Sequence, residues 1–352
     1  MDAIFNKEVT TVYAADVISF AKKMGYFPKN AKNKDFSFSD SYAPVDFGGA
    51  RFCELRVWAM FNKIADGMDQ YFEYGKGNIH YDKKGYATNR MPLWVKPNHK
   101  VDVKEVMDFM RDHLEGTELD MSKDIGAGAF GNPYRWRPMT WKVEGTSYCN
   151  ERVTATQQTG FSFVSQSRSW LPDEIGGIIW FGVDDAASSC YFPMYSAATE
   201  VPYAFARGNG SMLEFTNEAA FWVFNQISNF AYTRYSYIHP EIEKKQNVTE
   251  RAFMETVKVI DAKAKALYDA GKKEEALATV TNFSVKEGNA MVDDWRRFYG
   301  YLFAKYVDGN VKTKVPNQMN PKLEQPGYNK EWYEKVVKDA GEKLKMKGDA
   351  GH

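Results

Sequence analysis

The sequence has few of the side chains that bind metals or form covalent intermediates. It contains 3 cysteines and 5 histidines in 352 residues. An odd number of widely spaced cysteines argues against a disulfide framework and against a zinc site. Cys53 and Cys190 lie among apolar neighbours, so we interpret both as small buried side chains. We interpret His113, beside Asp112 on a predicted helix, as a surface or hydrogen-bonding residue and not as a base.

Several sequence signatures of enzymes are also absent. The histidines show no H-E-x-x-H spacing and the chain has no G-x-S-x-G motif, which disfavours a zinc peptidase and an α/β-hydrolase serine. "GAGAFG" (126–131) fits G-x-G-x-x-G, but "NPYRWRP" follows with two prolines, so no helix opens there to face a pyrophosphate. We therefore predict neither a cofactor nor a metal.

Charge and hydropathy exclude further classes of partner. Lys plus Arg number 46 and Asp plus Glu number 46, so no net field favours nucleic acid. No run of about 18 apolar residues is present, and no membrane span is expected. What the chain does have is 44% hydrophobic and 15% aromatic residues, enough for a substantial core. The compartment is left open.

The spacing of apolar residues predicts strands in the centre of the chain and helices towards its C-terminal end. Helices are expected over 14–24, 50–65, 101–116, 216–238, 247–270, a region ending at Gly309, and 329–345. Asn247 and Glu250 have the spacing of a capping box. Strands are expected over 36–49 (entering a loop), 160–168, 176–184 and 188–195, and a wandering connection over 310–328. This segregation favours an α+β fold over a parallel βαβ series.

Three groups of polar residues are candidate functional sites. Asp184 and Asp185 form either an acid–base pair or, as we prefer, a turn in which aspartates accept backbone amides. Asn132, Arg135 and Arg137 lie among tryptophans, where guanidinium groups either clamp a carboxylate or attach a loop to the sheet. The polar stretch 151–168 has strand propensity and either lines a solvated cleft or forms an edge strand with one wet face.

Several stretches occur together in an order that resembles the PepD-like dipeptidases. They are "FSFSDSYAPVDFGGARFCELRVW", "MRDHLEGTELDM", "GAFGNPYRW", "TQQTGFSFVSQSR", "LPDEIGGIIWFGVDDAASSCYFPMY" and "AAFWVFNQISN". This cysteine peptidase family belongs to the N-terminal-nucleophile hydrolases, and the secernins are related to it. The resemblance covers roughly residues 10–240.

The resemblance implies a partial αββα sandwich of antiparallel sheets over residues 1–240, with residues 241–352 as a helical extension packed on it. It also implies hydrolysis of dipeptide amide bonds by the thiol of an N-terminal cysteine, with acylase chemistry on N-acyl amides as the related alternative. By the same resemblance, Asn132 and Arg135 would lie near the substrate carboxylate. Thr159 and Gln166 would line the cleft as donors, and Asp184 would organise a turn at its rim.

The sequence departs from this family at the nucleophile. Residue 1 is Met, Cys53 and Cys190 fall within predicted elements, and freeing the amine of Cys149 would discard 148 residues. We therefore expect a C-terminal portion of a dipeptidase, inactive by itself, that forms a homo-oligomer or associates with the missing N-terminal segment. The alternative is a non-catalytic peptide-binding or assembly module that complements a chain carrying the cysteine.

Overall fold

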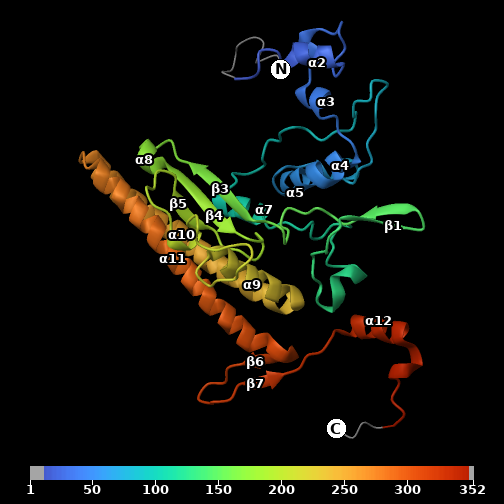
Figure 1. Cartoon of the computed structure of the whole chain (residues 1–352), viewed down its shortest axis with the longest axis vertical. Coiled ribbons are helices and arrows are strands. Elements are labelled where there is room, and N and C mark those ends of the chain that lie inside the picture. Colours follow the sequence, from blue (N-terminus) through green and yellow to red (C-terminus); the bar gives the residue numbers. More distant parts are fainter. Residues whose placement is uncertain (1–11, 349–352) are drawn as a thin grey trace. The chain divides into compact units, whose positions relative to one another are not determined.

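The computed structural model describes residues 12–348, and its contacts divide the chain into two compact units between Val101 and Asp102. Helices and small antiparallel sheets give an α+β fold, as the sequence predicts (Figure 1). Among residues 12–348, no helix combines the length and apolar character that a membrane span requires.

The N-terminal unit is built from short helices. They are α2 (Val17–Met24), η1 (Asn33–Asp35), α3 (Phe38–Tyr42), α4 (Phe47–Gly49), η2 (Ala50–Glu54), α5 (Leu55–Ile64), η3 (Met68–Tyr71) and α6 (Phe72–Gly75). The strand predicted over 36–49 is wrong, because side-chain caps begin two helices there. Ser37 accepts from the Asp40 amide at 3.4 Å, and Asp46 accepts from the Gly49 amide at 2.7 Å.

The helix predicted over 50–65 is confirmed, although its first turn, η2, is a π-helix. The Trp58 indole donates to the Met68 carbonyl at 2.7 Å and thereby attaches η3 to α5. At Gly75, a Cβ atom would lie 2.9 Å from Leu55 Cδ1, so a larger residue would force the Leu55 side chain to move where α6 approaches α5. Cys53 is exposed, and its predicted burial is wrong because the helix turns it away from Leu55 and Trp58, which are buried.

The C-terminal unit contains a three-stranded antiparallel sheet in the order β3 (Phe161–Ser167), β4 (Gly177–Val183) and β5 (Phe192–Tyr195). The three central strands are therefore confirmed, with Phe163 opposite Phe181 and Ile179 opposite Met194. The polar strand predicted over 151–168 is shorter than expected, because its first ten residues form turns before β3 begins.

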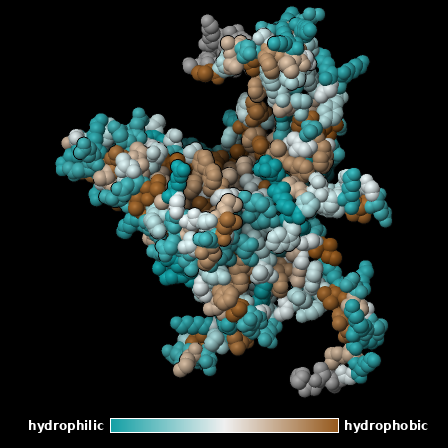
Figure 2. Space-filling view, in the orientation of Figure 1, coloured by the Kyte–Doolittle hydropathy of each residue, from teal (hydrophilic) through white to brown (hydrophobic). Residues whose placement is uncertain are grey.

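Three long helices cover this sheet: α9 (Ala220–Thr233), α10 (Tyr235–Asp269) and α11 (Lys273–Tyr306) (Figure 1). They share one apolar core with the strands, whose largest buried side chains include Trp180, Tyr195, Phe224 and Trp295. Figure 2 shows hydrophilic colour along the free end of the α10–α11 hairpin and hydrophobic colour beside it over the sheet. The hairpin turns at Gly271, which has φ +78° and follows the end of the predicted helix 247–270.

Helix α10 differs from the sequence prediction. It runs without a break through Pro240 and Asn247, so Asn247 and Glu250 do not form a capping box, and the predicted domain division at residue 240 falls inside the helix. Helix α9 begins at Ala220 and not at the predicted residue 216. Burial of one face of α10 against the sheet outweighs the backbone hydrogen bond that Pro240 removes.

The remaining elements are short. They are α7 (Val103–Phe109), η4 (Ile125–Phe130), β1 (Thr140–Val143), β2 (Thr146–Cys149), α8 (Asp173–Gly176), η5 (Tyr203–Phe205), η6 (Val307–Gly309), β6 (Val311–Thr313), β7 (Lys322–Glu324), α12 (Lys330–Ala340) and η7 (Gly341–Leu344). Helix α7 begins at a capping box of Asp102 and Glu105 but ends well before the predicted Gly116. The 310–328 connection contains the hairpin β6–β7. "GAGAFG" forms 3-10 turns kinked at Gly128, so no dinucleotide-binding helix opens there.

Candidate functional site

The paired aspartates that follow β4 are buried. Asp184 and Asp185 are 1% and 0% exposed, so their predicted place at a rim is wrong. The backbone turns sharply at Asp184, which has φ +68° and donates its amide to the Gly160 carbonyl at 3.0 Å. This turn lies next to the start of β3 and places both carboxylates against α9.

Asp184 is held by donors from α9. Its carboxylate accepts from the Asn225 amide at 2.8 Å and from the Ser228 hydroxyl at 2.7 Å. Burial raises the pKa of Asp184 to about 6, although these two hydrogen bonds oppose the shift. The carboxyl group therefore titrates close to neutral pH.

Asp185 is held by two tyrosines. Its Oδ2 accepts from the hydroxyls of Tyr134 and Tyr232, the latter at 3.0 Å, and its Oδ1 accepts from the Ala187 amide at 3.2 Å. The last contact is the turn chemistry that the sequence predicts. Burial, followed by the charge of Asp185, raises the pKa of both tyrosines, so they remain protonated donors.

A histidine extends this buried network. His113 is 2% exposed and lies outside α7, so its assignment to a helix is wrong, whereas its hydrogen-bonding role is confirmed. Its Nε2 lies 2.9 Å from the Tyr134 hydroxyl and its Nδ1 lies 2.9 Å from Glu115 Oε1. Burial opposes ionisation of Glu115, but the hydrogen bonds and charge of His113 lower the pKa of Glu115 to about 2.

The loop that carries Asn132 and Arg135 lies above this network. The Asn132 amide donates to the Tyr232 carbonyl at 3.1 Å, and Asn132 Oδ1 accepts from the Tyr134 amide at 3.0 Å. The Arg135 guanidinium donates to the Asn132 and Tyr134 carbonyls and pairs with Asp124 at 2.6 Å. Both side chains therefore order their own loop, and Asn132 also attaches it to α9.

A small cleft opens beside this loop. Its volume is about 30 Å³, and its lining includes Arg135, Trp136, Arg137, Arg152, Thr156, Gln157 and Gln158. Arg137 and Arg152 are exposed, and Arg137 donates a long hydrogen bond of 3.4 Å to Gln158 Oε1. A carboxylate that entered the cleft would meet guanidinium groups, glutamine amides and the face of an indole.

The structure links four of the five predicted site residues and separates the fifth. Asn132 and Asp184 both contact α9, and Thr159 precedes the Gly160 carbonyl that accepts the Asp184 amide. The Thr159 hydroxyl lies 3.4 Å from that of Thr156, which lines the cleft with Arg135. Gln166 lies towards the other end of β3 and accepts from the Trp180 indole at 3.0 Å.

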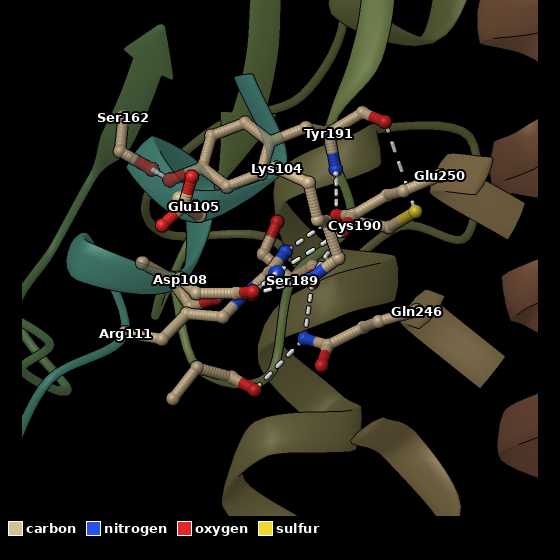
Figure 3. A network of polar contacts seen from close by, with 12 residues as sticks. Lys104, Glu105, Asp108, Arg111, Ser162, Ser189, Cys190, Tyr191, Gln246 and Glu250 are labelled. Atoms are coloured by element: carbon tan, nitrogen blue, oxygen red, sulfur yellow. Dashed lines mark hydrogen bonds and ion pairs between the residues drawn. The ribbon is translucent and has the colours of Figure 1, made fainter. Parts of the chain in front are cut away.

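Sequence reasoning missed a second buried network around Glu250 (Figure 3). Glu250 is 0% exposed and accepts a bidentate pair from Arg111, whose Nη1 lies 3.0 Å from Oε2. It also accepts from the Tyr191 amide at 3.0 Å, and Lys104 lies 3.6 Å away. The network joins α7, the start of β5 and α10. The sequence does indicate that Glu250 is buried, because Glu250 precedes Phe253 and Val257 on the apolar face of α10.

The cysteines occupy three different environments. Cys190 is buried, as predicted, and burial followed by the charge of Glu250 raises the pKa of its thiol. Cys53 is exposed in η2, and Cys149 is half-buried at the end of β2. All three are internal residues, so their amines are part of peptide bonds. In the described part of the chain, no three His, Cys, Asp or Glu side chains gather as a metal ion would need.

Comparison of the sequence with known proteins identifies the family of the chain. The family model of "Peptidase family C69" matches residues 2–248. A protein of Salmonella dublin named "Probable dipeptidase" is 24% identical over 191 residues, which are 54% of this chain and 36% of that protein. The match thus spans about a third of the relative's length. The resemblance to the dipeptidases is confirmed, and the chain belongs to peptidase family C69.

Proposed function

We propose that the protein is a peptide hydrolase of the dipeptidase type that uses an N-terminal cysteine from outside residues 1–352. The match to peptidase family C69 over residues 2–248 carries this proposal, and the relative named a probable dipeptidase supports the substrate class. The assignment of the nucleophile to a cysteine outside residues 1–352 rests on the surroundings of Cys53, Cys149 and Cys190 described above.

None of these cysteines has the chemistry of an N-terminal nucleophile. In that mechanism the free α-amine of the cysteine accepts the thiol proton as sulfur attacks the substrate carbonyl. The amines of Cys53, Cys149 and Cys190 are in peptide bonds and cannot serve as this base. Cys190 is in addition kept as a thiol by burial.

The reaction proceeds through a thioester. The attack forms a C–S bond and a tetrahedral oxyanion, which donors across the cleft stabilise. The C–N bond then breaks and the leaving amine takes the proton. Water hydrolyses the thioester, which releases the amino acid and restores the thiol. Thr159, whose hydroxyl lies 3.4 Å from that of Thr156 in the cleft wall, is the proposed donor of this chain, whereas Gln166 lies towards the other end of β3.

The cleft at residues 135–158 is the proposed site for the substrate carboxylate. Arg137 and Arg152 are the guanidinium groups with the most freedom to bind it, since Arg135 donates to its own loop and to Asp124. Asn132 and Arg135 then act beside the carboxylate by ordering the cleft wall, and Asp184 acts by shaping the turn beneath it.

The proposed fold is a partial αββα sandwich. Helices α9–α11 pack with the β3–β4–β5 sheet in one core, while Phe161 and Phe163 of β3 are 61% and 49% exposed. In the proposal, this apolar strip receives strands of the polypeptide that carries the cysteine, or a second copy of the chain.

Hydrolysis of Ala-Ala tests the proposal. The 352-residue chain is to be assayed alone and beside the polypeptide encoded by its full reading frame, with iodoacetamide-treated samples as controls. We expect amine release only from the longer polypeptide, blocked by iodoacetamide. Release by the shorter chain would contradict the assigned nucleophile. Binding of Ala-Ala without hydrolysis by either would favour the alternative, a non-catalytic peptide-binding module.

A further inference from the structure

The N-terminal unit contains a pocket that the proposed function does not use. Its volume is about 430 Å³, within the range of roughly 300–1,000 Å³ typical of small-molecule sites. The wall is formed by Ser39 and Asp40 of α3, Glu54 of η2, Val57 of α5, and residues Ala87, Arg90, Met91, Pro92 and Leu93. All of these residues belong to the same compact unit.

An ion pair between Arg90 and Glu54 lies at one side of the pocket. Arg90 Nε donates to Glu54 Oε1 at 3.0 Å, and its Nη2 contacts the same oxygen. Tyr74, which is 2% exposed, donates its hydroxyl to Glu54 Oε2 at 2.6 Å. Both oxygens of Glu54 therefore have donors, and its charge is neutralised by Arg90.

Asp40 is left as the surplus charge. Its Oδ1 lies 3.3 Å from Arg90 Nη1, a long contact that Arg90 shares with the Ser39 hydroxyl, also at 3.3 Å. Within residues 12–348, Asp40 Oδ2 accepts no hydrogen bond. Two carboxylates and one guanidinium give the lining a charge of one negative unit, so a cation is attracted and an anion must compete with Glu54 for Arg90.

The other side of the pocket is apolar and partly exposed to water. Leu93 is 94% exposed and Val57 is 39% exposed, whereas Met91 is buried at 8%. Ala87 and Pro92 complete this wall. A ligand with an apolar body would remove Leu93 and Val57 from water, which contributes binding free energy in proportion to the area covered.

We propose that this pocket binds an organic monocation, a primary ammonium on a small apolar body. The ammonium donates to Asp40 Oδ2, and the body covers Val57, Met91 and Leu93. This site is independent of peptide hydrolysis, because none of its residues enters the proposed carboxylate cleft.

Titration with three probes of one shape tests the proposal. The probes are benzylammonium, neutral benzyl alcohol and anionic benzoate, and the readout is the methyl resonance of Met91 in the full chain labelled at methionine methyl groups. Benzylammonium is expected to give a saturable shift, benzyl alcohol an affinity about fivefold lower, and benzoate no saturable shift. Equal or tighter binding of benzoate would overturn the proposal.

Two variants locate the charge and the apolar wall. Asp40→Asn is expected to weaken benzylammonium binding about fivefold, whereas Asp35→Asn, which removes an exposed carboxylate outside the pocket, keeps it within about twofold. Leu93→Ser changes a side chain that is 94% exposed, so it preserves folding, and it is expected to weaken binding severalfold. Equal affinities of Asp40→Asn and Asp35→Asn, or an unchanged affinity of Leu93→Ser, would refute the proposed site.

Discussion

Replacing Glu250 by Gln tests whether the network around it holds α7, β5 and α10 together. The variant keeps the shape of the side chain and an oxygen for the Tyr191 amide, but removes the charge that faces Arg111. Burial opposes the charge of Arg111, and it is Glu250 that keeps the pKa of Arg111 above its ordinary value. The variant therefore leaves a buried cation without its main partner.

The expected loss of stability follows from the burial of Arg111. Removing one partner of a buried ion pair costs about 3–5 kcal/mol. We expect the lower end, about 3 kcal/mol, because Arg111 keeps Asp108 at 3.1 Å and the Ala186 carbonyl at 3.1 Å. For a unit of this size, that loss lowers the Tm by roughly 6–12 °C.

Thermal unfolding of the full chain followed by circular dichroism measures the effect. Glu255→Gln is the matched control, since Glu255 lies on the same helix, is exposed and pairs with Lys258. We expect the control to change the free energy of unfolding by at most about 0.5 kcal/mol. A double variant, Glu250→Leu with Arg111→Met, is expected to cost less than Glu250→Gln alone. Equal Tm values for Glu250→Gln and Glu255→Gln would refute the reasoning.

Three further predictions concern the candidate site. The raised pKa of Asp184 favours the protonated form in the fold, so its contribution to stability is present below about pH 4 and is lost as pH rises through about 6. Asp184→Asn is expected to remove up to about 3 kcal/mol of that pH dependence, measured by urea unfolding at pH 4 and pH 7; parallel wild-type and variant profiles would contradict this. Tyr134→Phe removes a donor to Asp185 and a partner of His113, and it is expected to lower the free energy of unfolding by about 1–3 kcal/mol. The control Tyr148→Phe changes an exposed side chain and is expected to cost almost nothing. Equal Tm values for the two variants would refute the buried network. In the active polypeptide, Arg137→Ala and Arg152→Ala are expected to raise KM for Ala-Ala several-fold with little change for its C-terminal amide, whereas equal effects on both substrates would exclude the carboxylate cleft.

The elements that sequence reasoning predicts well are those whose signal is local. The strands β3 and β4 follow from alternation in "GFSFVSQSR" and from the continuous apolar run "GGIIWFGV", and both patterns depend only on neighbouring residues. Gly271 ends α10 because a left-handed residue closes the helix. These features require no knowledge of distant contacts.

The features that were missed depend on distant partners or on competing local signals. Phe36 and Phe38 alternate with serines as in a strand, but the Ser37 cap turns the segment into a helix. Burial of Asp184 depends on Asn225 and Ser228, about forty positions further along the chain. Glu250 satisfies the spacing of a capping box with Asn247, but α10 runs continuously through both residues and Glu250 pairs with Arg111 instead.

The candidate site was predicted in part for the same reason. The loop at Asn132 and Arg135 was recognised from its residue types, but types alone could not show that their polar groups are used within the loop. Arg152 and Gln157 join Arg137 at one cleft only through folding of the turns before β3. A prediction of the cleft therefore needed the path of the backbone over 139–160.

Labelling with an Ala-Ala chloromethyl ketone tests the assignment of the nucleophile most directly. The reagent alkylates the thiol that attacks the substrate carbonyl, and peptide mapping by mass spectrometry identifies the modified residue. In the polypeptide that hydrolyses Ala-Ala, the account predicts one adduct, on an N-terminal cysteine outside residues 1–352. A stoichiometric adduct on Cys53, Cys149 or Cys190 that abolishes hydrolysis would contradict it.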